Sequence, residues 1–411
     1  MRVSFLLSAI VVAGLGLAAP AASKVEGNTI VLGAAVSLTG KYSIDGQHTK
    51  NGYELAVKRV NEQGGVKVGG KAYKVEIRYY DDESSNERAA SLVERLIAQD
   101  GIKFILGPYS SPLTGAIVPV TEKYKIPMVE ANGASRSLFT KGYRYLFAVL
   151  STSDQYLSSA VDLAAEKARE AGRDPSSLRL ALAMGDDSFS LDVRAGIIDA
   201  AKRYGMTVVI DDKVPDNFTD VSATLARVKA VKPDVLLVSG HAMGAATATR
   251  QIADAKVDVP VLAMTHCDSA QIAEKFGSAA EYTLCASQWA PTLAYSDKWF
   301  GSAGDYNTLF QKTYGYEAPY QAAESSAAVL VFVDAIQRAN GFETEKVRDA
   351  LARTDVQTFY GPIKFDETGK NVVKPMMLYQ VQDGDYKVVA PTKWATAKLI
   401  YPRPAWSKRG S

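Results

Sequence analysis

The chain has 411 residues, with 47 lysines and arginines against 45 aspartates and glutamates, and 47% of its residues are hydrophobic. This is the composition of an ordinary globular protein, so collagen-like, low-complexity and disordered classes are excluded. The length predicts two or three domains, each with its own core. Because the charges nearly balance and form no block of one sign, we expect neither nucleic acid nor an acidic membrane surface as a partner.

The first residues of the chain predict export. Arg2 precedes an uncharged stretch over 5–22, and small residues at Ala19, Ala21 and Ser23 form a cleavage site. This pattern is typical of a signal peptide over 1–23. A membrane anchor would need about 20 strongly apolar residues, and glycines and a proline interrupt this stretch. We therefore expect the mature protein to be exported and free of the membrane.

The cysteines and histidines give no metal-binding spacing. Export leaves open whether Cys267 and Cys285 form a disulfide or remain two buried thiols. The three histidines, His48, His241 and His266, are scattered and do not combine with the cysteines into a zinc framework. We expect neither a metal site nor a cofactor.

Short apolar, β-branched runs alternate with segments of helical period. The segment 89–100 is an example of the helical pattern, with an apolar face and polar residues turned away. Continuous apolar strands between such helices predict parallel sheets covered on both faces. The series runs twice, with a break near 148–152, and therefore predicts two α/β lobes. The expected strands are 29–36, 74–82, 102–107, 126–131, 145–150, 178–185, 207–212, 234–240, 259–265 and 282–288.

The alternation of short strands and helices ends after residue 288. Helices are expected around 297–314, 321–340 and 344–353. The segment 358–371 then predicts a hairpin, with Gly361-Pro362 before one strand and 367–370 as its turn. Since no linker rich in Gly, Ser or Pro separates the lobes, we expect several tight crossings to join them.

No segment carries the signature of a catalyst. The stretch 65–72 approaches a phosphate loop, but it places Ala72 where a hydroxyl is needed and lies between a helix and a strand. The aspartate pairs at 81–82, 186–187 and 211–212 follow strands, where they more often cap the next helix or turn than act as an acid and a base. We do not expect an enzyme.

Three polar loops stand at the expected carboxyl ends of strands, where open α/β sheets bind ligands. They cover 37–40, 107–111 and 132–135, and each leads into a helix. Hydroxyls and free backbone N–H groups at a helix N-terminus suit a carboxylate. The simpler interpretation is that each Ser or Thr only caps its own helix, and the sequence leaves both open.

These residues, taken in order, resemble the periplasmic solute-binding proteins of branched-chain amino-acid ABC importers, the leucine/isoleucine/valine-binding type. The matching motifs span most of the chain: S-L-T-G at 37–40, N-G-x-x-L-A at 51–56, N-x-x-G-G-V at 61–66, G-P-Y-S-S at 107–111 and F-Y-G-P-I-K-F-D at 359–366. The resemblance implies the type I periplasmic binding protein fold: two Rossmann-like lobes with parallel sheets, three hinge crossings and the ligand between them. It also implies a periplasmic monomer whose partners are a small-molecule ligand and an ABC permease in the inner membrane.

The resemblance further implies lobe boundaries and site residues. Residues 24–148 plus 289–357 would form the first lobe, and 149–288 plus 358–411 the second. The residues implied to hold the ligand's carboxylate are Ser110, Ser111, Gly133, Ala134 and Ser135. On the second lobe, the aromatic residue that covers the ligand in this family falls on Phe189.

The sequence departs from the amino-acid binders on the second lobe. The tyrosine expected after Gly240 is His241, and the carboxylate that should pair with the ligand's ammonium falls on Thr265, beside His266. A buried ammonium needs an anionic or strong acceptor partner. The ligand either lacks an ammonium or uses Asp268 in its place, so α-amino acids and other small carboxylates both remain open.

Aromatic residues widen the choice of ligand. Tyr42, Tyr109, Phe189 and Trp289 could wall an apolar slot for an aromatic acid, or could be ordinary core residues. We expect the binding subunit of an importer, with a sensor module on the same scaffold as the alternative. An exported amidase or esterase would need a nucleophile, a base and an orienting group, and the only trio to nominate is Ser110, His241 and Asp268.

Overall fold

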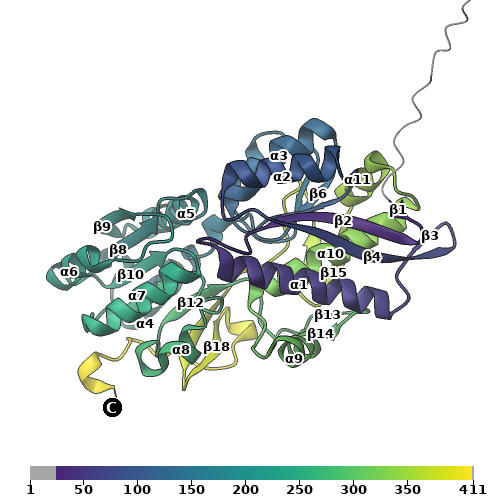
Figure 1. Cartoon of the computed structure of the whole chain (residues 1–411). Coiled ribbons are helices and arrows are strands. Elements are labelled where there is room, and N and C mark those ends of the chain that lie inside the picture. The colour runs from purple at the N-terminus through teal and green to yellow at the C-terminus, as the bar shows by residue number, and fades with distance from the viewer. Residues whose placement is uncertain (1–24, 410–411) are drawn as a thin grey trace, which may run out of the picture.

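The computed structural model describes residues 25–409, so the expected signal peptide over 1–23 lies outside the described residues. Two α/β lobes lie side by side (Figure 1). The green helices from the last third of the chain return to the purple N-terminal lobe, and the second lobe is mainly teal. Between residues 25 and 409, no helix is long and apolar enough to cross a membrane.

The first sheet has the strand order β3-β4-β2-β5-β6-β7, with β1 paired to β2. Strands β2, β4, β5, β6 and β7 run parallel, while β1 and β3 pair antiparallel. Strand β2 is buried over nearly its whole length, as expected for a strand covered on both faces. The bounds are β1 Val25–Glu26, β2 Thr29–Val36, β3 Val66–Val68, β4 Lys71–Asp81, β5 Ile105–Leu106, β6 Met128–Glu130 and β7 Leu146–Ala148.

Helices cover both faces of this sheet, with α2 and α3 above it and α1 and α10 below it in Figure 1. Helix α10 is buried along nearly its whole length and packs on α1. The carbonyl of Ala322 leaves no room for a side chain at Gly52, which is why the two helices approach so closely. The helices of this first lobe are α1 Ser43–Glu62, α2 Asn86–Ala98, α3 Ser111–Tyr124, α9 Ala303–Tyr314, α10 Tyr320–Ala339 and α11 Thr344–Ala352.

The second sheet has the order β18-β17-β12-β11-β10-β8-β9. Strands β8 to β12 are parallel, and β17 and β18 add an antiparallel edge. The strands are β8 Arg179–Gly185, β9 Thr207–Val214, β10 Val235–Ser239, β11 Val261–Met264, β12 Leu284–Ser287, β17 Met377–Gln382 and β18 Asp385–Ala390. The helices of this second lobe are α4 Ser158–Glu170, α5 Ser188–Tyr204, α6 Ser222–Val231, α7 Ala242–Asp254 and α8 Ile272–Phe276. Cys267 and Cys285 form a disulfide that ties the loop after β11 to β12.

Two expected elements differ from the structure. The helix expected from 297 begins at 303, because β13 Ser296–Asp297 pairs with β14 Gly301–Ser302 and Ser302 then caps α9. The hairpin expected over 358–371 differs in part. Its turn is present, because an antiparallel bridge between Phe365 and Asn371 closes the segment 366–370 around the Asp366 carboxylate, which accepts N–H groups from Thr368 and Lys370. A second hairpin that was not expected precedes it: β15 Asp355–Thr358 pairs with β16 Gly361–Lys364 through a turn at 359–360, whose two residues are aromatic and fully buried.

The chain passes between the lobes three times, after β7, after β12 and after β16. One residue from each crossing joins a buried polar network. The N–H of Ser151 donates to Gln288 Oε1 at 2.6 Å, and its hydroxyl donates to the carbonyl of Lys374 at 2.6 Å. The Lys374 ammonium donates to the carbonyl of Gln288, and burial lowers its pKa to about 7. The three crossings therefore contact one another directly.

Candidate functional site

The carboxyl ends of the two sheets face each other, and a cavity of about 640 Å³ lies there. The first turns of three helices line it: α2 with Ser85 to Glu87, α3 with Ser111, and α5 with Ser188. Each helix N-terminus carries free N–H groups and a partial positive charge. The volume is within the usual range for small-molecule sites. The helix N-termini favour an anionic group, while the carboxylates in the same lining favour a cationic one.

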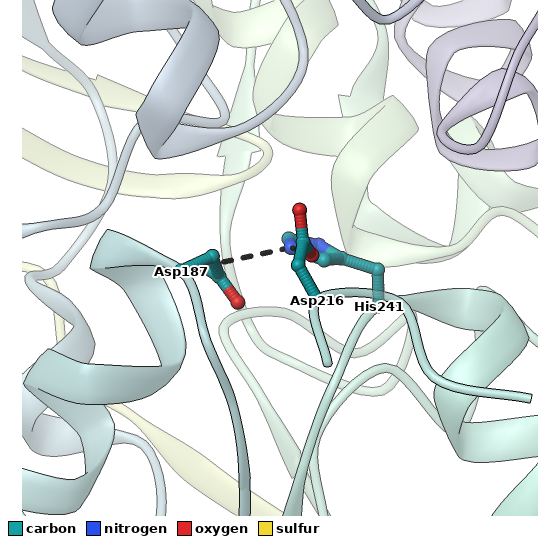
Figure 2. A group of neighbouring side chains, drawn as sticks. All are labelled: Asp187, Asp216 and His241. Carbon is teal, nitrogen blue, oxygen red and sulfur yellow. Dashed lines mark ion pairs between the residues drawn. The ribbon is translucent and has the colours of Figure 1, made fainter. Parts of the chain in front are cut away.

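The second lobe places Asp187 and Asp216 on this cavity, with the buried His241 beside them (Figure 2). Asp187 caps α5, because its Oδ1 accepts the N–H groups of Phe189 at 2.8 Å and Ser190 at 3.2 Å. His241 Nε2 lies 3.7 Å from Asp187 Oδ1 and 3.8 Å from Asp216 Oδ1. Burial alone would lower the pKa of His241, but these carboxylates outweigh burial and raise it.

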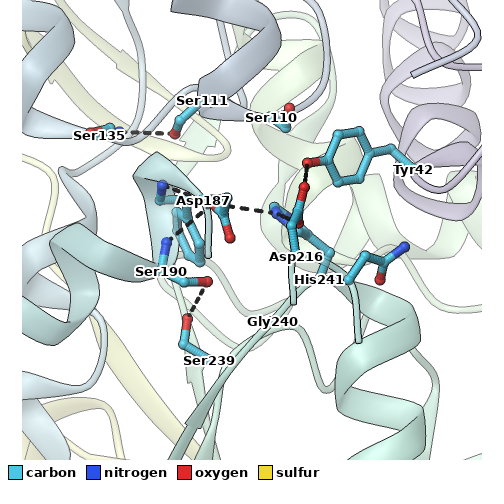
Figure 3. A network of polar contacts seen from close by, with 12 residues as sticks. Tyr42, Ser110, Ser111, Ser135, Asp187, Ser190, Asp216, Ser239, Gly240 and His241 are labelled. Carbon is cyan, nitrogen blue, oxygen red and sulfur yellow. Dashed lines mark hydrogen bonds and ion pairs between the residues drawn. The ribbon is translucent and has the colours of Figure 1, made fainter. Parts of the chain in front are cut away.

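On the first lobe, Ser110 and Ser111 begin α3 (Figure 3). Ser110 has φ +85°, a conformation that non-glycine residues rarely adopt and that is concentrated at functional sites. Ser111 Oγ accepts the N–H of Ser135 at 3.0 Å. The hydroxyl hydrogen of Ser111 remains available to a ligand, and this residue lines the cavity.

Most polar groups of the loop 132–135 form hydrogen bonds within the protein. The N–H of Gly133 donates to Glu130 Oε2, and the carbonyl of Ala134 accepts the N–H of Ser153. Burial raises the pKa of Glu130 to about 8. A side chain at Gly133 would collide with Thr114. Gly133 therefore reaches a ligand carboxylate only if its bond to Glu130 breaks.

Tyrosines of the first lobe hydrogen-bond directly to the second. The Tyr109 hydroxyl lies 2.8 Å from His241 Nδ1 and 2.9 Å from His266 Nε2. The Tyr42 hydroxyl donates to Asp216 Oδ2 at 2.7 Å. Phe189 packs against His266, with 5.2 Å between ring centroids. The lobes are thus in contact across the cleft, and these side chains form one aromatic cluster.

Trp289 does not join that cluster. Its ring packs on Tyr306 and Phe359, and its Nε1 donates to the carbonyl of Phe359 at 3.2 Å. Of the four aromatic residues expected around the ligand, the structure brings together Tyr42, Tyr109 and Phe189 only.

The two residues considered for the ligand's ammonium also lie apart from the acidic pair. The Thr265 hydroxyl donates to the carbonyl of Gly240 at 2.8 Å. Asp268 accepts the N–H groups of Ser269 and Tyr320, and it lines a different cavity. Burial raises the pKa of Asp268 to about 7. Four carboxylates line the cavity instead: Glu87, Asp186, Asp187, which the sequence predicted only as a helix cap, and Asp216, which no motif indicated.

The nominated catalytic trio is not assembled either. Ser110 Oγ accepts the N–H of Leu113, His241 bonds Tyr109, and Asp268 bonds backbone groups. Within residues 25–409, no hydrogen bond links any two members of the trio.

The chain is similar to known binding proteins over most of its length. The family model for periplasmic binding proteins matches residues 29–385. The Leu/Ile/Val-binding protein homolog 8 of Brucella abortus is 26% identical over 384 residues, which cover 91% of this chain and 93% of that protein.

Two solved structures share the fold. One is LivJ, the branched-chain amino acid transporter substrate binding protein of Streptococcus pneumoniae, in complex with isoleucine; its TM-score is 0.76 at 21% identity, covering 88% of this chain and 100% of LivJ. The other is a solute binding protein of an ABC transporter from Rhodopseudomonas palustris, in complex with 3,4-dihydroxy benzoic acid. Its TM-score is 0.76 at 20% identity, covering 93% of this chain and 100% of that one. With its two parallel-sheet lobes of the type I fold and a family match over most of its length, the chain belongs to the periplasmic binding proteins.

Proposed function

We propose that this protein is the extracytoplasmic substrate-binding subunit of an ABC importer, which closes two lobes on a small carboxylated ligand. The supporting observation is the cavity between the lobes, where the N-termini of α2, α3 and α5 converge beside the free hydroxyl hydrogen of Ser111. In this proposal 24–148 plus 289–357 move as one lobe and 149–288 plus 358–411 as the other. The signal peptide is removed near residue 23, and the mature monomer delivers its ligand to an inner-membrane permease.

The first ligand class we propose is the branched-chain or other hydrophobic amino acids. The binding of isoleucine by LivJ supports this class. Asp187 and Asp216 supply the carboxylates that Thr265 lacks, because both line the cavity. A ligand with an ammonium would approach this pair while its carboxylate meets Ser111.

The second ligand class is an aromatic carboxylate or a small amide. The aromatic cluster of Tyr42, Tyr109 and Phe189 supports it, as does the aromatic acid bound by the Rhodopseudomonas palustris protein. Its polar end would also meet Ser111. A sensor module would use the same cleft, and the membrane partner separates the two roles: co-purification with a permease supports import.

A thermal-shift screen of the mature protein tests the proposal. The ligand sets are hydrophobic amino acids, aromatic carboxylates and small amides, each in buffer with a chelator. A ligand at a hundred times its Kd adds about 2.7 kcal/mol and raises the melting temperature by a few degrees. We expect one set to do so and Ser111→Ala to reduce the shift, whereas Asp211→Asn, a surface control paired with Arg194, leaves it unchanged. If no ligand set raises the melting temperature, or if Ser111→Ala leaves the shift unchanged, the proposal is contradicted.

A further inference from the structure

Three side chains that lie far apart in the chain meet on the second lobe. Asp187 follows β8, Asp216 follows β9 and His241 follows β10. These strands are neighbours in the sheet, in the order β10-β8-β9, so their loops emerge side by side. One ligand atom from each residue lies within 4.8 Å of the others (Figure 2).

Each of these groups has an unpartnered atom. His241 is 1% exposed, and its Nε2 forms no hydrogen bond. Asp187 Oδ2 and Asp216 Oδ1 are likewise buried without a hydrogen-bond partner. The imidazole edge is aimed between two carboxylates at 3.7 and 3.8 Å, which is too long for a hydrogen bond. Buried polar atoms normally have a partner, so the facing pair of His241 Nε2 and Asp216 Oδ1 is suited to a bound group. Asp187 Oδ1, the third atom on this side, already accepts the N–H groups of Phe189 and Ser190 and would bind through its remaining lone pair.

The other ring nitrogen of His241 is held by a chain of hydrogen bonds. Its Nδ1 lies 2.8 Å from the Tyr109 hydroxyl, which lies 2.9 Å from His266 Nε2. When the hydroxyl donates to His266, it accepts Nδ1–H from His241. The Nε2 lone pair then points between two anions, an arrangement that a cation stabilises. A histidine that binds a metal commonly donates its other N–H to an oxygen in this way.

We propose that Asp187, Asp216 and His241 form a site for a divalent transition-metal ion, Zn²⁺ in the first place, on the wall of the cleft. One imidazole and two carboxylates form a donor set that Zn²⁺ accepts, with a fourth position left for water or a ligand. Ligand atoms in a tetrahedral zinc site lie about 3.3–3.5 Å apart, as follows from bond lengths of about 2.0–2.1 Å. The two distances from His241 Nε2 exceed that spacing by a few tenths of an ångström, and the two carboxylate oxygens lie within 4.8 Å of each other.

The surroundings leave the ion accessible and its charge balanced. Asp187 and Asp216 both line the cavity, which gives the ion a route from solvent. Lys41 and Tyr42 contact Asp216 through Oδ2, so the Oδ1 that faces His241 is free. A divalent ion would neutralise the two carboxylates. An ion here would occupy the pair that the first ligand class offers to an ammonium, so a bound ion favours the second class, a carboxylate without an ammonium.

Titration of the metal alone tests the proposal. Untagged mature protein is stripped with a chelator, dialysed, and titrated with ZnCl₂ in a calorimeter; Co²⁺ serves as a spectroscopic probe through its visible absorption. We expect one ion per chain, and a Co²⁺ band typical of tetrahedral coordination. Loss of a group that only supports a metal ligand lowers metal affinity by up to about 100-fold. Because Asp216→Asn and His241→Gln remove the ligands themselves, each should weaken Zn²⁺ binding by more than that. Asp211→Asn, whose carboxylate pairs with Arg194, should not change it.

The variants also need a folding check, for which we use the melting temperature in chelating buffer. Asp216 is partly exposed, so Asp216→Asn keeps the test available if His241→Gln fails to fold. Absence of Zn²⁺ binding overturns the proposal, as does binding that survives Asp216→Asn. Binding of a cationic amino acid through these residues without any metal binding would also overturn it, since the pair would then serve the ligand's ammonium. None of these results affects the thermal-shift test with organic ligands.

Discussion

The Tyr109 hydroxyl links the first lobe to two histidines of the second, and Tyr109→Phe removes it. The hydroxyl lies within 2.9 Å of two imidazole nitrogens on the second lobe, and Tyr109 is 2% exposed. The substitution deletes two hydrogen bonds across the cleft while it keeps the ring and its packing. Each bond contributes about 0.5–1.5 kcal/mol net, so the closed arrangement should lose about 1–3 kcal/mol. That corresponds to a closed-to-open ratio lower by about 5- to 150-fold.

Small-angle X-ray scattering of the ligand-free mature protein measures this change. We expect the radius of gyration to increase in Tyr109→Phe. Tyr53→Phe is a matched control, because its hydroxyl donates to the carbonyl of Gly107 at 2.9 Å within the first lobe. That control should lower the melting temperature without changing the radius of gyration. If Tyr109→Phe lowers the melting temperature and leaves the scattering unchanged, the hydroxyl supports the fold only and the reasoning is refuted.

Three further outcomes are expected. Ser111→Ala removes a hydrogen bond to a charged ligand group and should weaken carboxylate binding by about 1.5–3 kcal/mol in calorimetry; unchanged affinity would contradict this role. Burial raises the pKa of Asp82 from 3.8 to about 6, so its ionisation destabilises the fold above pH 6 and not below pH 4. Asp82→Asn should therefore stabilise the protein at pH 7.5 by up to about 3 kcal/mol. Chemical denaturation should show this gain disappearing towards pH 4. A gain that is the same at all pH values would refute the reasoning. Replacing Cys267 and Cys285 by alanine should cost about 3 kcal/mol, and reductant should then leave the variant's melting temperature unaffected.

The positions of most strands along the chain could be predicted from the sequence because buried parallel strands are continuous apolar runs. Strand β2 occupies the expected range, 29–36, and the later strands shift by only a few residues. The hairpin turn at 366–370 could be predicted from its polar residues, whereas the preceding turn at 359–360 was missed because its residues are aromatic and buried in the core. Turn composition alone carries no information about burial.

The second-lobe part of the site could not be predicted because it depends on the order of strands in the sheet. Asp187 was predicted as a cap and is one. Its contact with Asp216 and His241 exists because β9 and β10 flank β8. The spacing of histidines and cysteines carries no information about this cluster, because spacing detects local motifs and these three residues come from separate loops. Glu130 likewise binds the Gly133 N–H group that the family resemblance assigned to the ligand.

The account's central claim is that a small carboxylate binds between the lobes, and a crystal structure tests it most directly. The mature protein would be crystallised with the compound that gives the largest thermal shift. We predict one ligand in the cavity lined by Ser111, Asp187 and Asp216, with a carboxylate oxygen within hydrogen-bond distance of Ser111 Oγ. A ligand in the separate cavity lined by Asp268 and Tyr386, or one in the cleft whose carboxylate faces away from Ser111, would contradict the claim.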